Sequence, residues 1–318
     1  MYESLKQLDS VRIHFDQAGI NTINIVLALI MFGVALGIST KTFKEIFIKP
    51  KSIIVGLCLQ WFALPAVTFL LITILRDYIT FNVAMGMILV ASCPGGNISN
   101  FMSSYAKANT ELSVSMTAIA TILATFITPI NFSLWGGLYH HFVMSNALVD
   151  VPTLSIGFWP MFKQVLILLG IPIICGMLFS YYFKKISKKM IKPFQILSLI
   201  FFIALVFIAF KNNYAIFVKY LFIIFFLVLI HNLLAMSTGY LGAAAFKLPK
   251  KDRRTLCIEV GIQNSGLGLV LLFNPAIFPQ ENMGGMLIIT AWWGIWHIIS
   301  GLTISTIFRH NRHKKMIA

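Results

Sequence analysis

Nine long apolar runs, separated by short polar segments, are the feature that most limits how this chain can fold. The runs cover residues 22–39, 53–75, 80–106, 111–138, 156–183, 193–210, 216–246, 254–274 and 286–308. A helix needs about 20 apolar residues to cross roughly 30 Å of hydrocarbon. Because 58% of the residues are hydrophobic and only 11% are charged, an ordinary soluble domain and a disordered chain are both excluded. The sequence therefore predicts an all-α polytopic membrane protein with nine transmembrane helices.

Basic residues are distributed unevenly between the two sets of alternating loops. One set, which includes 40–52, 184–192, 247–254 and the tail, contains 19 Lys and Arg, whereas the other set contains 5. Cytoplasmic loops carry the excess of Lys and Arg in membrane proteins. We therefore expect an extracytoplasmic N-terminal segment, 1–21, and a cytoplasmic basic tail, 309–318, which requires an odd number of spans. These loops account for the net charge of +15 without nucleic-acid binding.

Two of the runs contain residues that interrupt a helix. The third run contains Pro94, Gly95 and Gly96, and the eighth contains Glu259 followed by the polar stretch 263–266. Proline and glycine destabilise a helix interior by roughly 3 and 1 kcal/mol per residue. Backbone groups freed in lipid must find partners or line a wet cavity. The two interrupted runs are five spans apart, so they are predicted to cross the membrane in opposite directions.

Interrupted helices at corresponding, inverted positions indicate the binding site of a secondary transporter. They divide the chain into a first repeat, residues 22–138, with four helices and no opening helix, and a second inverted repeat, residues 156–308, with five helices. No segment between the runs is long enough for a soluble domain.

Glu259 is the only acid that is predicted near the middle of the membrane. An unpaired charge there costs about 2.5–3.5 kcal/mol on insertion scales, and such residues are mostly functional. Glu259 is interpreted as a cation ligand or a proton carrier; the structural alternative is a carboxylate held by neighbouring polar groups. Gln263 would share its helix face if the helix continued that far, and Ser113 and Thr117 share a face at the start of the fourth span.

Further oxygen donors lie near the same breaks. Ser99 and Asn100 follow the Pro-Gly-Gly sequence, and Gln60 is a lone amide in the second span. Hard cations such as Na⁺ prefer several carboxylate, amide, hydroxyl and carbonyl oxygens. The alternatives are that Ser113 and Thr117 are small helix-packing residues and that Gln60 makes an interhelical hydrogen bond.

Each break also exposes a helix N-terminus with unpaired N–H groups and a partial positive charge. Asn97 and Asn264 lie beside the breaks and could orient the oxygens of a bound anion. This arrangement favours an anionic organic substrate whose charge is offset by Na⁺.

Three motifs resemble those of the bile acid:sodium symporter family, and the resemblance extends from about residue 23 to 308. They are Pro94-Gly95-Gly96-x-x-Ser99-Asn100, Leu112-Ser113-x-x-x-Thr117 and Glu259-Val260-Gly261-x-Gln263-Asn264-Ser265-Gly266. Lesser similarities are Gln60 five residues before Pro65, the pair His231-Asn232, and Trp296-His297-x-Ile299-Ser300-Gly301.

The resemblance implies a core domain with two crossed discontinuous helices, a panel domain packed against it, two sodium ions and no organic cofactor. The first sodium site would use Ser99, Asn100, Ser113, Thr117 and Glu259. The second would use Gln60, Glu259, Gln263 and the carbonyl groups of Val260 and Ile262.

The predicted substrate contacts are Asn97, Asn264, His297 and Ile298. Two of them depart from the family pattern, because Asn97 stands where relatives commonly carry Thr and Ile298 stands where bacterial relatives have Asn after the His. The alternative for His297 is a hydrogen-bonded core histidine.

The sequence thus predicts a secondary active transporter, not an enzyme, in the cytoplasmic membrane of a bacterium. It would carry a bile-acid-like or small carboxylate anion into the cell with sodium, by alternating access. The alternatives are a proton-coupled transporter of the same fold, a membrane-embedded enzyme that uses Glu259 and His297, and a passive channel.

Overall fold

The computed structural model describes residues 2–9, 17–38, 50–141, 158–212, 214–274, 277–278 and 283–317. All regular elements in these ranges are helices, and the β-type pairing found there is an isolated bridge between Gly95 and Gln263. Five helical stretches are long and apolar enough to cross a membrane: Pro50–Ile74, Thr110–Tyr139, Phe158–Tyr182, Phe222–Ala245 and Gly284–His310. The prediction of an all-α polytopic membrane protein is therefore confirmed.

The first half of the chain contains one uninterrupted helix, one helix with a π turn, one helix that breaks into two parts, and one long helix. Its elements are α2 (Gln17–Leu36), α4 (Pro50–Cys58), η1 (Leu59–Ala63), α5 (Leu64–Ile74), α6 (Phe81–Ser92), α7 (Ile98–Tyr105) and α8 (Thr110–Tyr139). They correspond to the four apolar runs between residues 22 and 138. Residues 39–49, which include most of a predicted basic loop, lie outside the described residues.

The second half contains a second helix with a π turn, two long helices, a second helix that breaks into two parts, and the C-terminal helix. Its elements are α9 (Phe158–Val165), η3 (Leu166–Gly170), α10 (Ile171–Tyr182), α11 (Lys184–Asn212), α12 (Tyr214–Ala245), α13 (Lys250–Gly261), α14 (Ser265–Leu272) and α15 (Gly284–Ile317). The helix α15 continues through the predicted tail 309–318 as far as Ile317. The predicted loop between the two halves falls largely on residues 142–157, which lie outside the described residues.

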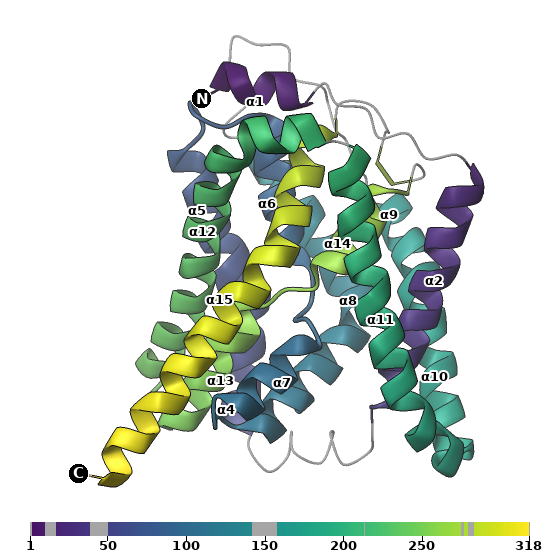
Figure 1. The fold of residues 1–318 in the computed structure, drawn as a ribbon, viewed down its shortest axis with the longest axis vertical. Coiled ribbons are helices and arrows are strands. Elements are labelled where there is room, and N and C mark those ends of the chain that lie inside the picture. The colour runs from purple at the N-terminus through teal and green to yellow at the C-terminus, as the bar shows by residue number, and fades with distance from the viewer. Residues whose placement is uncertain are drawn as a thin grey trace.

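A short N-terminal helix, α1 (Tyr2–Asp9), lies within the segment 1–21, for which no helix was expected. Leu5 and Leu8 are fully buried, and α1 packs on α6, α12 and α15. In Figure 1, α1 lies across one end of the molecule, and the C-terminal end of α15 lies at the other.

The contacts divide most helices into two groups. In the smaller group, α2, α10 and α11 pack chiefly on one another. In the larger group, α12 packs on α13 and α15, and α6 packs on α8 and α15. The two broken helices, α6 with α7 and α13 with α14, both belong to the larger group.

Both predicted helix interruptions are present, and their extended segments pair with each other. Gly96 N–H donates to the Ile262 carbonyl at 2.9 Å, and Asn264 N–H donates to the Pro94 carbonyl at 2.8 Å. These bonds satisfy backbone groups that the breaks remove from helical pairing, as a hydrocarbon environment requires. The two breaks therefore meet inside the larger helix group.

A polar cluster ties α13 to the start of α8, which carries Ser113 and Thr117. Asp252 accepts hydrogen bonds from Ser52 Oγ at 2.6 Å and from Asn109 Nδ2 at 2.8 Å. Asn109 also caps α8, since its Oδ1 accepts from Leu112 N–H at 3.1 Å. This cluster sets the position of the first turn of α8 relative to α13.

Candidate functional site

Glu259 lies two residues before the end of α13 and is fully buried. Ser99 Oγ donates to its Oε1 at 2.6 Å, Thr117 Oγ1 donates to its Oε2 at 3.1 Å, and Ser113 Oγ also hydrogen-bonds to Oε1. Within the described residues, no Lys or Arg forms an ion pair with this carboxylate. The carboxyl group of Glu259 is thus surrounded by neutral oxygen atoms.

The predicted first sodium set converges on this carboxylate from three elements. Ser99 and Asn100 come from α7, Ser113 and Thr117 from α8, and Glu259 from α13. Asn100 Oδ1 lies 2.9 Å from Ser113 Oγ and 3.2 Å from Thr117 Oγ1. All five residues therefore form one connected group of oxygen donors.

The predicted second set lies around the end of α13. Gln60 Nε2 donates to the Glu259 carbonyl at 3.3 Å, and Gln263 Nε2 donates to the Val260 carbonyl at 2.8 Å. The side-chain oxygens of Gln60 and Gln263 are buried and have no hydrogen-bond partner among the residues that the structure describes. Buried polar atoms without partners are uncommon in native proteins, so these two oxygens could bind a cation.

Gln263 does not share a helix face with Glu259. The helix α13 ends at Gly261, and Gln263 lies in the extended segment that pairs with Gly95. The Ile262 carbonyl accepts from Gly96 N–H, so one of its lone pairs is already in use. The break, rather than helical spacing, brings Gln263 to the site.

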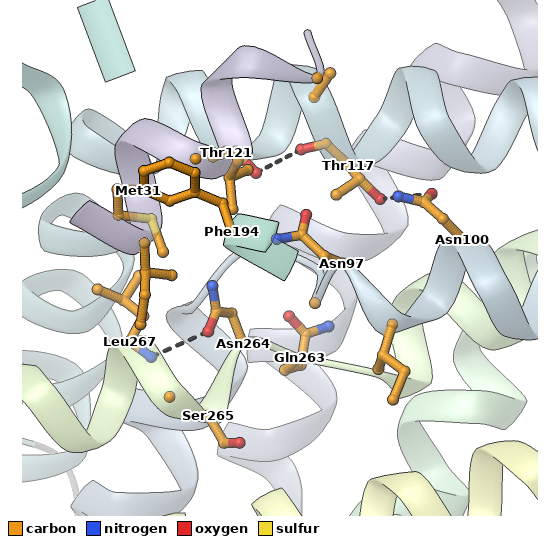
Figure 2. A pocket seen from close by; sticks show the side chains of 18 of the residues that line it. Met31, Asn97, Asn100, Thr117, Thr121, Phe194, Gln263, Asn264, Ser265 and Leu267 are labelled. Carbon is orange, nitrogen blue, oxygen red and sulfur yellow. Dashed lines mark hydrogen bonds between the residues drawn. The ribbon is translucent and has the colours of Figure 1, made fainter. Parts of the chain in front are cut away.

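A cavity of about 570 Å³ lies beside the two breaks. Its wall includes all four predicted substrate residues, Asn97, Asn264, His297 and Ile298. Figure 2 shows the side chains of Asn97 and Asn264 directed toward the same space, with Thr117 and Gln263 nearby. Asn264 also caps α14, because its Oδ1 accepts from Leu267 N–H at 3.0 Å.

The opposite wall of the cavity is apolar and was not predicted. It is formed by Leu27, Ile30, Met31 and Val34 from α2 and by Phe194 from α11. The sequence contained no signal for these residues, because both helices are apolar over most of their surfaces. An amphipathic ligand matches a cavity with one polar and one apolar wall.

No Lys or Arg is among the described residues that line the cavity. The first residues of α7 and α14 do line it, so two helix N-termini face this space. Their N–H groups and partial positive charge favour an anionic group on the ligand.

Known proteins provide an independent comparison. The model of the Sodium Bile acid symporter family matches residues 24–220. A Bacillus subtilis (strain 168) protein, the uncharacterized sodium-dependent transporter YocS, is 32% identical over 92% of this chain and 84% of its own length. An Arabidopsis thaliana protein, the probable chloroplastic sodium/metabolite cotransporter BASS1, is 28% identical over 91% of this chain and 67% of its own.

A third relative, the P3 protein of Mus musculus, is 28% identical over 74% of this chain, which spans only 47% of that protein's length. The family match covers more than half of the chain, and the motifs that first suggested it meet at the buried site around Glu259. The chain therefore belongs to the sodium bile acid symporter family, two of whose members above are named as a sodium-dependent transporter and a probable sodium/metabolite cotransporter.

Proposed function

We propose that this protein is a symporter that uses sodium to carry an organic anion into the cell. The observation that carries the proposal is the environment of Glu259: a fully buried carboxylate that accepts hydrogen bonds from three hydroxyl groups and has no basic partner among the described residues. Removing a charge from water is costly unless an opposite charge is bound. A sodium ion among these oxygens would balance it.

The oxygen donors support two sodium ions. The first would bind Ser99, Asn100, Ser113, Thr117 and Glu259, which are already in mutual contact. The second would bind Gln60, Gln263 and Glu259 with the carbonyl groups of Val260 and Ile262. The Gln60 and Gln263 side-chain oxygens, which have no partner within the described ranges, support this second assignment.

The cavity beside the breaks is proposed as the substrate site. Its polar wall would hold the anionic group at Asn97, Asn264 and His297, and its apolar wall on α2 would contact the body of the molecule. The sodium ions would offset the charge of the anion. A bile-acid-like or small carboxylate substrate is consistent with this division.

The transport cycle that we propose depends on nine crossings in two inverted repeats, residues 22–138 and 156–308. The larger helix group would act as the core and the smaller group, α2, α10 and α11, as the panel. Core and panel would move relative to each other so that the cavity opens to one side at a time. Sodium must favour the state that accepts substrate, and this coupling is reciprocal.

The proposed orientation follows the distribution of Lys and Arg. The N-terminal segment 1–21 would lie outside and the basic tail 309–318 in the cytoplasm of a bacterial cell. Outside sodium would then bind first at the crossing and order it for the anion.

Uptake by proteoliposomes tests the proposal. A panel of labelled organic acids is presented with an inward sodium gradient and again after the gradient is collapsed. We expect gradient-dependent uptake that Glu259→Ala abolishes without preventing membrane insertion. Glu111→Ala, in the exposed first turn of α8, is the control and should transport normally.

The other outcomes are specific. Wild-type uptake rates in Glu259→Ala would refute the assignment of Glu259. Uptake driven by a pH gradient and indifferent to sodium would select the proton-coupled alternative. Chemical conversion of a substrate that is not carried across the membrane would favour the alternative of a membrane-embedded enzyme.

A further inference from the structure

Two buried asparagines donate side-chain hydrogen bonds to backbone carbonyls on neighbouring helices. Asn131 Nδ2, on α8, donates to the Trp61 carbonyl at 2.9 Å. Asn232 Nδ2, on α12, donates to the Gly261 carbonyl at 2.7 Å. The two side chains are 4% and 1% exposed, so both hydrogen bonds are formed away from water.

The Trp61 carbonyl lacks its usual α-helical donor because of a proline. In an α-helix each carbonyl accepts from the N–H four residues later, and for Trp61 that residue is Pro65, which has no N–H. Trp61 lies inside η1, where Leu64 N–H donates to the Leu59 carbonyl in the π pattern. Asn131 replaces the donor that Pro65 cannot provide.

The Gly261 carbonyl needs a donor because the helix breaks there. In a continuous helix its partner would be the Ser265 N–H. Ser265 N–H instead donates to the Gln263 carbonyl at 2.9 Å. Asn232 therefore supplies the hydrogen bond that the break removes.

Both carbonyls are next to proposed ligands of the second sodium ion. Trp61 follows Gln60 directly, and Gly261 lies between Val260 and Ile262. A π turn alone does not mark the site, because η3 is also a π segment followed by a proline, Pro172. What distinguishes η1 is that it carries Gln60, whose side chain reaches the Glu259 carbonyl.

We propose that Asn131 and Asn232 are positioning residues for the second sodium site, each holding an irregular backbone that presents its ligands. The inference rests on the proposed function. It predicts that both asparagines affect the same ion, although they lie on different helices and bond to backbones about 200 residues apart. Apart from Glu259, which both sets share, the first sodium set lies on α7 and α8, and neither helix contains either carbonyl.

Sodium binding to the purified protein tests this inference without a substrate. The probe is radioactive sodium chloride, with choline chloride keeping the ionic strength constant. In Asn131→Leu and Asn232→Leu an apolar side chain of similar size replaces each amide. Loss of a residue that orients a metal ligand typically weakens affinity 10–100-fold. We expect each variant to retain one ion at wild-type affinity and to bind the other about 10–100-fold more weakly.

Matched controls come from the same helices. Thr128 is a buried residue on α8 whose hydroxyl has no hydrogen-bond partner in the described part of the chain, and the Thr238 hydroxyl on α12 donates within its own helix to the Leu234 carbonyl. Thr128→Val and Thr238→Val should bind both ions as the wild type does. If a leucine variant aggregates, the corresponding serine variant, Asn131→Ser or Asn232→Ser, is used in its place. Its shorter side chain does not reach the carbonyl.

The outcomes separate the two proposals. Wild-type affinity for both ions in the asparagine variants overturns the positioning role, and so does an equal weakening of both ions, which would indicate a general loss of structure. A wild-type protein that binds no sodium above the choline background overturns the proposed function itself. If the wild type binds two ions and both asparagine variants selectively lose one of them, the result supports both the positioning role and the proposed function.

Discussion

Gly95 lies directly against Glu259. A Cβ atom at position 95 would be 3.2 Å from Glu259 Oε2 and 2.9 Å from Gln60 Nε2. Both separations are tighter than nearly all real Cβ contacts, and neither neighbour can move without disturbing the proposed sodium ligands. The glycine at this position is thus required by the close approach of the two broken segments.

Gly95→Ala should therefore lower sodium-dependent uptake at least about tenfold, with normal expression, because the added methyl group displaces Gln60 or Glu259. Initial uptake rates as a function of sodium concentration measure the effect. Gly137→Ala is the control, because a Cβ atom there would meet nothing within 4 Å. Equal rates in the two variants would mean that the crossing tolerates the extra carbon and is looser than the structure indicates.

The location of the candidate site could be predicted from residue type alone. Pro94 followed by two glycines destabilises a helix interior, and Glu259 is an acid in an apolar run, so both mark irregular, polar positions in a membrane protein. The pairing of Gly96 with Ile262 could not be predicted, because it joins segments that are distant in sequence and depends on where each helix ends. Gln263 shows this limit, since its place follows from the break and not from its spacing to Glu259.

Other features carry too weak a signal in the sequence. The helix α1 has eight residues, and so short a helix depends on tertiary packing, here through Leu5 and Leu8. The π turn η1 does not change the apolar pattern of its run, and Pro65 is the only local hint of it. The apolar wall of the cavity could not be predicted either, because Met31 and its neighbours are of the same residue types as side chains that face lipid.

Ser113 and Thr117 should act through the same ion. Each places a hydroxyl beside the Glu259 carboxylate, so Ser113→Ala and Thr117→Val should each raise the half-saturating sodium concentration for uptake by about tenfold or more. Groups that share a ligand are not additive. The double variant should therefore fall short of the product of the single effects in a double-mutant cycle. Strict additivity would place the two hydroxyls at separate sites.

Asn264 should separate substrate binding from helix capping. Its Oδ1 caps α14, and loss of such a cap costs about 1 kcal/mol. Asn264→Ser keeps a capping oxygen but removes the amide NH₂ from the cavity wall. We expect a higher KM for the organic anion and unchanged sodium binding in the absence of substrate.

Asn264→Ala, which loses both functions, should also lower the thermal stability of the protein. If Asn264→Ser transports with a wild-type KM, the anion does not contact this amide. Weaker sodium binding in Asn264→Ser without any change in stability would instead assign Asn264 to the ion sites.

Asp9 should make the docking of α1 sensitive to pH. Burial raises the pKa of Asp9 to about 7, although hydrogen bonds from Thr80, Asn82 and the Gly285 backbone act in the opposite direction. A detached α1 would have an ordinary Asp pKa of about 3.9. Between these two values the docked form binds more protons than the detached form, so docking weakens as the pH rises from about 4 to about 7 and is constant above that.

Hydrogen exchange of the α1 amides, corrected for the intrinsic rate at each pH, measures this dependence. Protection should fall between about pH 5 and pH 7.5 in the wild type, because the buried carboxyl must ionise at the starts of α6 and α15. Asp9→Asn cannot ionise and should remove the slope. Glu3→Gln, an exposed position on the same helix, should leave it unchanged. A slope that persists in Asp9→Asn would show that another group controls the docking of α1.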